Sequence, residues 1–182
     1  MMDTQRLNGI IDGGSLLGPL RNPGEHLTLS FHNRVIADVI GPEGDLVQHI
    51  DHRDNVLCTH GLNRLIEMLA SDAGGASAWV SAAAIGTDTT AANSTQDSLG
   101  NSTQIVHLSQ ASMAGSDAGS LTLQYNCTFA SDGNAAAIHE AGLFATNAAT
   151  ANAVARSVLG TDSINRGSAD EIRISYQIVA GT

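Results

Sequence analysis

Lysine is absent from this chain of 182 residues, and all eight basic residues are arginine. The absence excludes a phosphate-binding loop of the Walker type and Schiff-base chemistry, because both depend on a lysine amine. Eighteen acidic residues give the chain a formal net charge of −10. A nucleic-acid backbone or an anionic membrane would repel such a chain, so we expect neither as a partner.

Aromatic residues are also scarce, at 3% of the chain, and small or polar residues crowd its middle. Each strand can therefore bury little apolar surface, which at about 25 cal/mol per Å² offsets little of the entropy lost on folding. A subunit of this kind gains stability by sharing surface with neighbours. The composition thus favours a homo-oligomer or a larger assembly.

Long apolar runs are missing as well. No segment reaches the roughly 18 consecutive apolar residues of a membrane span, and no basic stretch followed by an apolar run opens the chain as in a signal peptide. We therefore expect a soluble protein that is synthesised in the cytoplasm. In that compartment Cys58 and Cys127 are expected as buried thiols, with a disulfide between them as the alternative.

Glycine and proline interrupt residues 1–26 so often that neither helical nor strand periodicity develops. This segment is predicted to be an extended N-terminal arm. It is too apolar for a solvated linker, so we expect it to lie against a partner rather than to form a free tail. Arg6 and Arg21 are available to pair with carboxylates on that partner. The expected apolar contacts of the arm are Leu7, Ile10, Ile11, Leu16, Leu17 and Leu20.

Residues 27–182 are predicted to form one mainly β domain. Apolar residues alternate with polar ones from Leu27 to Val39, and a Gly-Pro-Glu-Gly turn over 41–44 leads to a second leg that ends at Ile50. This pattern predicts a β-hairpin. Apolar residues then recur at helical spacing, which predicts one α-helix near 59–70 with Thr59 as its N-cap.

The second half of the chain predicts strand after strand, separated by loops rich in Gly, Ser, Asn and Asp. One of these loops is the turn-forming sequence at 131–134. Such spacing is typical of an antiparallel β-sandwich or barrel, here with one α-helix packed on it. The predicted strands span 79–85, 104–108, 121–129, 138–144, 154–159 and 172–178.

The stretch 49–54 is the most attractive metal candidate because it gathers two histidines and two aspartates. In a strand, however, His49 and His52 point to opposite faces and cannot both ligate one ion without a bulge. The chain has no Gly-x-Ser-x-Gly elbow, neither cysteine lies in a nucleophile signature, and the loop 86–100 lacks the acidic spacing of an EF-hand. We expect no enzymatic activity, metal, cofactor or small-molecule substrate.

Two charged residues fall on predicted apolar strand faces. Glu140 would share a face with Ile138 and Phe144, whereas Arg156 would share one with Val154 and Val158. A buried charge is tolerated only when it is paired. We therefore predict a structural ion pair between Glu140 and Arg156, against the alternative of two unrelated exposed side chains. Gly142, in the same strand as Glu140, is predicted to mark a bulge or a close approach of backbone.

The order of these features is similar to that in small virion proteins of tailed bacteriophages. The resemblance covers residues 30–180. The matching features are the Gly-Pro-Glu-Gly hairpin, Asn55-Val56 leading to Thr59-x-Gly61-Leu62-Asn63, Gly86-Thr87-Asp88-Thr89-Thr90, Glu140-x-Gly142-Leu143-Phe144, Ala155-Arg156-Ser157 and a closing alternating strand.

The resemblance implies a structural protein of the virion, located at the head, in the tail fibre or in the baseplate. The chain has no heptads or repeats typical of a fibre shaft, and it has few aromatic anchors for a receptor-binding tip. We therefore expect a capsid decoration (cement) protein on the outer surface of the phage head. Its partners would be the major capsid protein and copies of itself, and a tail fibre, baseplate or tail-attachment subunit is the alternative.

Overall fold

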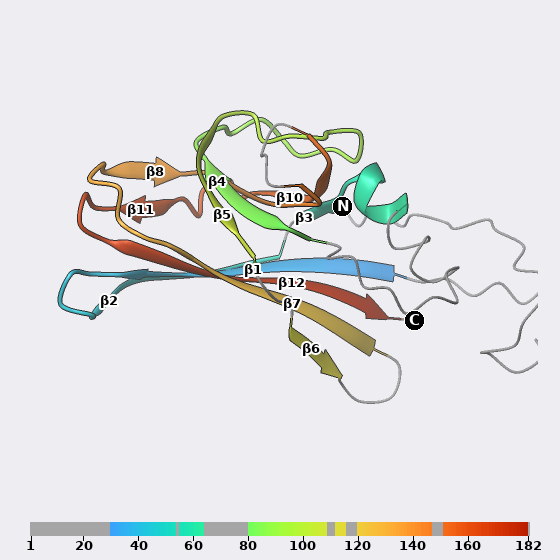
Figure 1. Ribbon diagram of the computed structural model, residues 1–182, viewed down its shortest axis with the longest axis horizontal. Coiled ribbons are helices and arrows are strands. Elements are labelled where there is room, and N and C mark those ends of the chain that lie inside the picture. Colours follow the sequence, from blue (N-terminus) through green and yellow to red (C-terminus); the bar gives the residue numbers. More distant parts are fainter. Residues whose placement is uncertain are drawn as a thin grey trace, which may run out of the picture.

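The computed structural model describes residues 30–53, 55–63, 80–108, 112–115, 120–146 and 151–181. In this part of the chain the fold is mainly β and consists of two antiparallel sheets that pack face to face (Figure 1). The prediction of an antiparallel β-sandwich is therefore confirmed. The predicted arm over 1–26 lies outside the described residues, and so do all the contact residues assigned to it.

Sheet A has the strand order β2-β1-β12-β7-β6, and every neighbouring pair in it is antiparallel. The longest strands, β1 and β12, run side by side over their full length. The strands of sheet A are β1 (Ser30–Ile40), β2 (Leu46–His52), β6 (Ser112–Gly115), β7 (Ser120–Phe129) and β12 (Glu171–Gly181).

Sheet B has the order β3-β10-β9-β4-β5 and is also antiparallel throughout. Its strands are β3 (Asn55–Leu57), β4 (Ala82–Gly86), β5 (Ser102–His107), β9 (Glu140–Phe144) and β10 (Ala153–Val158). A two-stranded sheet of β8 (Ala136–Ile138) and β11 (Ile164–Arg166) lies at one end of the sandwich (Figure 1).

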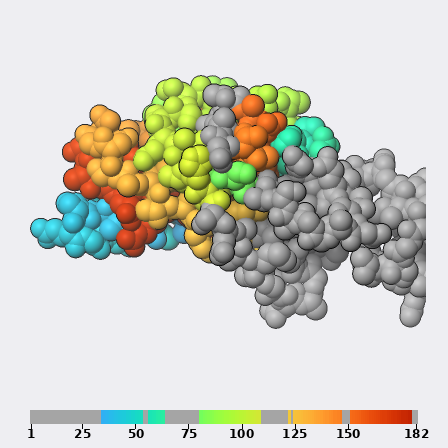
Figure 2. Space-filling view, in the orientation of Figure 1, coloured from blue at the N-terminus to red at the C-terminus, as the bar shows by residue number. Residues whose placement is uncertain are grey.

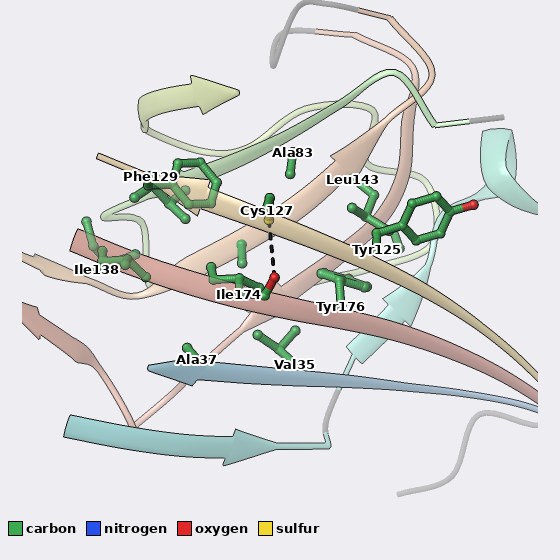
Figure 3. Packing of buried hydrophobic residues seen from close by; sticks show 14 of the residues in the cluster. Val35, Ala37, Ala83, Tyr125, Cys127, Phe129, Ile138, Leu143, Ile174 and Tyr176 are labelled. Atoms are coloured by element: carbon green, nitrogen blue, oxygen red, sulfur yellow. Dashed lines mark hydrogen bonds between the residues drawn. The ribbon is translucent and has the colours of Figure 1, made fainter. Parts of the chain in front are cut away.

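The main core lies between the two sheets, where alternate residues of each strand point inward. β12 contributes Ile174 and Tyr176, β7 contributes Tyr125 and Cys127, and β9 contributes Leu143 from the opposite sheet (Figure 3). This alternation follows from the two-residue period of a strand, which places every second side chain on one face. Cys127 also donates its thiol to the Ile174 carbonyl at 3.5 Å.

The central strands of sheet B are buried on both faces. All five residues of β4 and all five of β9 are buried, whereas sheet A carries polar side chains such as Arg34, Asp51 and Gln177 on its outer face. The segment 87–101, here called the covering loop, arches over β4 and β10 (Figure 1). A second apolar cluster lies on this outer face and includes Leu99 of the covering loop and Phe144 of β9. The sequence had indicated only that this segment is a loop.

The predicted hairpin is confirmed, since β1 and β2 pair antiparallel around the turn at 41–44. The predicted strand over 138–144 is wrong as one element, because it divides at His139 into β8 and β9. The His139 amide donates to the Gly86 carbonyl at 2.9 Å, and its carbonyl accepts from the Leu159 amide at 2.8 Å. The chain therefore joins sheet B only at His139, after β8 has paired with β11.

Residues 59–63 are helical, at the beginning of the predicted helix, and 64–70 lie outside the described part of the chain. The predicted capping role of Thr59 is wrong. The Cys58 carbonyl accepts the first helical hydrogen bond, from the Leu62 amide at 3.0 Å. Thr59 instead donates both its amide and its hydroxyl to the Ser94 carbonyl, at 2.7 and 2.8 Å. This threonine therefore fastens the covering loop to the helix start.

The two cysteines, Cys58 and Cys127, are both buried and free, as expected from the sequence. Burial raises the pKa of the Cys58 thiol to about 11 and that of Cys127 to about 12.

Within the described residues, no helix is long and apolar enough to cross a membrane.

Candidate functional site

The candidate site is a buried ionic network on the outer face of sheet B, centred on Arg156 of β10. Arg156 and Glu140 of the neighbouring strand β9 both have fully buried side chains. Arg156 donates to the Oε2 atom of Glu140 from Nε at 3.0 Å and from Nη2 at 2.8 Å. The ion pair predicted from the sequence is therefore present. Its burial means that each charge depends on the other for its stability.

The faces that led to this prediction need a correction. The register places Arg156 opposite Gly142 and Val158 opposite Glu140, so these residues share the outer face. Val154 instead belongs to the inner core, because the pairing of β10 with β9 shifts register between Ala153 and Ala155. Ile138 also packs in the inner core, since the chain bends at His139. Two local irregularities, the register shift in β10 and the bend at His139, therefore place Val154 and Ile138 on the inner face rather than the outer face.

The covering loop supplies two further acceptors for Arg156. Its Nη1 atom donates to Oε1 of Gln96 at 2.7 Å, and Nη2 donates to Oδ2 of Asp88 at 3.0 Å. Gln96 in turn accepts a hydrogen bond from the Asn93 amide at 2.9 Å. One guanidinium thus connects β10, β9 and two separate points of the covering loop, which a planar fork of donors is suited to do.

Backbone amides of the same loop converge on the Glu140 carboxylate. The Asp88 and Asn101 amides donate to Oε1 at 3.3 and 2.8 Å, and the Gly100 amide donates to Oε2 at 3.1 Å. Both ends of the covering loop are therefore held by one carboxylate. Gly86 allows this approach, because a methyl group there would overlap the Asn101 carbonyl and the Glu140 carboxylate.

Asp88 is oriented by its own turn. The amide and hydroxyl of Thr90 donate to its Oδ1 atom at 3.2 and 2.9 Å, which leaves Oδ2 for Arg156. These hydrogen bonds from Thr90, together with the charge of Arg156, hold the pKa of Asp88 below its ordinary value of 3.8. Asp88 therefore stays charged where the network requires a partner for arginine.

Glycines allow two more close approaches around the site. A Cβ atom at Gly142 would lie 2.9 Å from Cδ2 of Leu99 and 3.2 Å from the Ala155 carbonyl oxygen, so the nearest neighbour is a side chain rather than the backbone that the sequence predicted. Gly61, in the helical segment, lies against the backbone of Val154, and a Cβ atom there would overlap the Val154 carbonyl. The Cys58 amide donates to the same carbonyl at 2.9 Å.

A second buried arginine, which sequence reasoning missed, lies at the end of the sandwich. Arg166 of β11 donates to Oε1 of Gln104 at 2.8 Å and to both carboxylate oxygens of Asp132 at 2.8 and 2.9 Å. Asp132 belongs to the predicted turn at 131–134 and also accepts from the Asn134 amide at 3.0 Å. A signal was available, because Arg166 alternates with the apolar Ile164 and so falls on a buried face.

The histidines of the predicted metal stretch separate as expected. His49 lies opposite Asp38 on the outer face of sheet A and is 2.6 Å from its Oδ1 atom, whereas His52 lies opposite the buried Val35. No group of three or more His, Cys, Asp or Glu side chains is placed to hold a metal ion within the described ranges.

The Arg156 network has a structural role, because its hydrogen bonds join the covering loop to sheet B. Each oxygen of Glu140 accepts at least two hydrogen bonds, and Arg156 donates through all three of its nitrogen atoms. The loop residues Asp88 and Gln96 could not be found from the sequence, because a loop has no periodicity that shows which side chains turn inward. The network fixes the position of the covering loop on sheet B.

Comparison of the chain with protein-family models, with curated proteins and with solved structures gave no match.

Proposed function

We propose that this protein is a structural component of a tailed-bacteriophage particle, and specifically a capsid decoration (cement) protein. It would bind the exterior of the head, contact the major capsid protein and copies of itself, and stabilise the shell against the pressure of packaged DNA. This function follows from the resemblance of its sequence to small virion proteins, and one observation in the structure supports it.

That observation is the convergence of the resembling motifs. The segments beginning at Asn55, Gly86, Glu140 and Ala155 are far apart in the sequence, yet they contribute the adjacent strands β3, β10, β9 and β4 and the start of the covering loop. Polar residues of three of these segments, Asp88, Glu140 and Arg156, form one network. Most of the features that carry the resemblance therefore lie together in sheet B, as expected for a building block whose shape is its function.

The charge of the protein supports a position outside the shell. With a formal net charge of −10, the protein would be repelled by DNA packaged inside a capsid. On the outer surface of the head the protein would lie away from that DNA.

The mechanism of such a protein is thermodynamic linkage. A clamp that binds the mature, closed lattice more tightly than its precursor stabilises the closed form by mass action. A loop and a sheet that are locked by buried ion pairs lose little conformational freedom on binding, so less of the contact energy is spent on ordering them. The predicted arm over 1–26 would add apolar contacts along the joints of the shell.

Copy number tests the proposal. Densitometry of purified particles on a denaturing gel should show hundreds of copies of a decoration protein, whereas a tail fibre, baseplate or tail-attachment subunit would be present in a few copies. Absence of the chain from purified particles would refute both assignments. Deletion of residues 1–26 should abolish binding to the head while leaving the domain folded, and unchanged occupancy would contradict the role of the arm.

A further inference from the structure

The tip of the β1–β2 hairpin projects from one end of the molecule and exposes apolar side chains. Residues 42–47 are all exposed, and Leu46 and Val47 retain 59% and 54% of their accessible surface. They stand out as exposed large apolar side chains in the described part of the chain. Figure 2 shows this hairpin at the extremity of the molecule. We call residues 41–47 the hairpin tip.

The hairpin tip is held in one conformation. The Gly41 amide donates to the Asp45 carbonyl at 2.8 Å, and the Gly44 amide donates to the Gly41 carbonyl at 2.9 Å. Gly44 adopts a φ of 88°, which favours glycine. A surface that is ordered before binding loses less entropy when a partner docks.

The base of the tip is fixed to the body of the protein. Gln48 donates its amide to the Ser163 carbonyl at 3.0 Å and accepts from the Asn165 amide at 2.8 Å. Just beyond it, the pairing of β1 with β2 shifts register, so that Val47 is left between the paired residues Leu46 and Gln48. Bulges of this kind at sheet edges re-aim a side chain. Here the bulged residue is an exposed valine that contributes nothing to the core.

The charges around these apolar side chains define the partner. Glu43 and Asp45 are exposed within the tip, whereas Glu171 on the neighbouring strand, opposite Ile40, is already paired with Arg173. Two copies of the tip brought together would set carboxylates against carboxylates, which disfavours a symmetric contact with a second copy. The complementary surface is an apolar recess with Arg or Lys at its rim.

We propose that the hairpin tip is a docking element that inserts Leu46 and Val47 into an apolar, basic-rimmed recess of another protein. This inference rests on the proposed function, in which that protein is the virion shell. The two apolar side chains supply affinity on burial, and Glu43 and Asp45 orient the contact through the basic rim.

The experiment uses particles assembled without this chain and the purified full-length protein. The bound fraction after sedimentation gives the dissociation constant. The double variant Leu46→Ser with Val47→Ser removes the apolar contact, and Glu43→Arg reverses one charge of the tip. Matched controls are Asp97→Arg, which makes the same charge change on the exposed part of the covering loop, and Thr128→Ala on the exposed face of β7. Circular dichroism and thermal melting establish that each variant is folded.

We expect the double serine variant to bind at least tenfold more weakly, since two apolar side chains lose their burial. Glu43→Arg should weaken binding by a factor that becomes smaller as salt is added, because the lost interaction is electrostatic. Both controls should bind within twofold of the wild type. Wild-type affinity in both folded tip variants would overturn the docking role and leave the proposed function standing.

If the wild-type protein itself does not bind the particles, the proposed function fails and the docking role fails with it. A second measurement identifies the occupant directly. The photo-reactive amino acid benzoylphenylalanine, placed at Val47, should form cross-links to residues of a shell protein that lie near an Arg or Lys. The same group placed at Thr128 should form no such cross-links. A cross-link from position 47 to another copy of this chain would overturn the inference.

Discussion

The buried pair of Arg156 and Glu140 allows a quantitative test of the framework. Arg156→Met keeps the unbranched first part of the side chain and removes the four hydrogen bonds to Glu140, Gln96 and Asp88. The Glu140 carboxylate then stays fully buried with only backbone amides as donors. Breaking a buried pair in this way costs about 3–5 kcal/mol of folding free energy, because an uncompensated charge remains.

An exposed pair of the same kind provides the control. Arg173 donates to Glu171 at 2.7 Å, but its side chain is 60% exposed. Arg173→Met should therefore cost only about 0–1 kcal/mol. In a domain of this size about 1 kcal/mol corresponds to about 2–4 °C in the melting temperature. Arg156→Met should then lower the melting temperature by about 10 °C, and Arg173→Met by no more than about 4 °C.

The double variant separates charge from packing. Glu140→Gln combined with Arg156→Met removes both charges, so it should cost at least about 1 kcal/mol less than the sum of the two single variants. Urea denaturation of the full chain at pH 7, followed by circular dichroism, measures these free energies. The reasoning is refuted if Arg156→Met costs no more than Arg173→Met, or if the single costs add up to that of the double variant.

Three further outcomes follow from the structure. Gly61→Ala should destabilise the fold more than Gly160→Ala in the same urea assay. A methyl group at position 61 overlaps the Val154 carbonyl, whereas at position 160 only the positive φ of 59° disfavours a side chain; equal losses would contradict this. The Cys58 and Cys127 thiols, whose pKa values burial raises to about 11 and about 12, should resist iodoacetamide at pH 8 until the protein unfolds; mass spectrometry that finds labelled native protein would contradict this. The stability that three carboxylates with a lowered pKa contribute should be complete above about pH 5 and should fall progressively below it, because the unfolded state then binds protons that the folded state does not; urea midpoints at pH 6, 4 and 3 measure this, and an unchanged midpoint at pH 3 would refute it. Hydrogen bonds from arginine or from backbone amides lower the pKa of the three groups concerned, Asp51, Asp88 and Asp132, below the ordinary value of 3.8.

Much of the sandwich could be predicted from the sequence because its strands alternate between one buried and one solvated face. β1, β7 and β12 of sheet A show this period clearly. The rule is weaker for sheet B, since β4 and β9 are buried on both faces and their small residues carry no alternation. The predicted strand over 138–144 therefore ran through His139, where the structure turns.

The ion pair of Glu140 and Arg156 could be predicted from the sequence because a charged residue among apolar residues needs a partner. The same reasoning applied to Arg166 and Ile164 would have placed Arg166 in the interior. Its partner Asp132 could not be chosen by periodicity, because it lies in a turn at a sequence separation of 34. Thr59 was misassigned for a related reason, since its acceptor, the Ser94 carbonyl, comes from a loop 35 positions away.

Both ends of the covering loop are hydrogen-bonded to one carboxylate, that of Glu140. The Asp88, Gly100 and Asn101 amides all donate to Glu140, so the loss of that one acceptor removes hydrogen bonds at both ends of the segment together. Hydrogen exchange at these three positions should consequently report one shared free energy of opening, rather than the graded values of a fraying segment. The middle of the loop has separate attachments, from Ser94 to Thr59 and from Gln96 to Arg156, so this opening would concern its two ends.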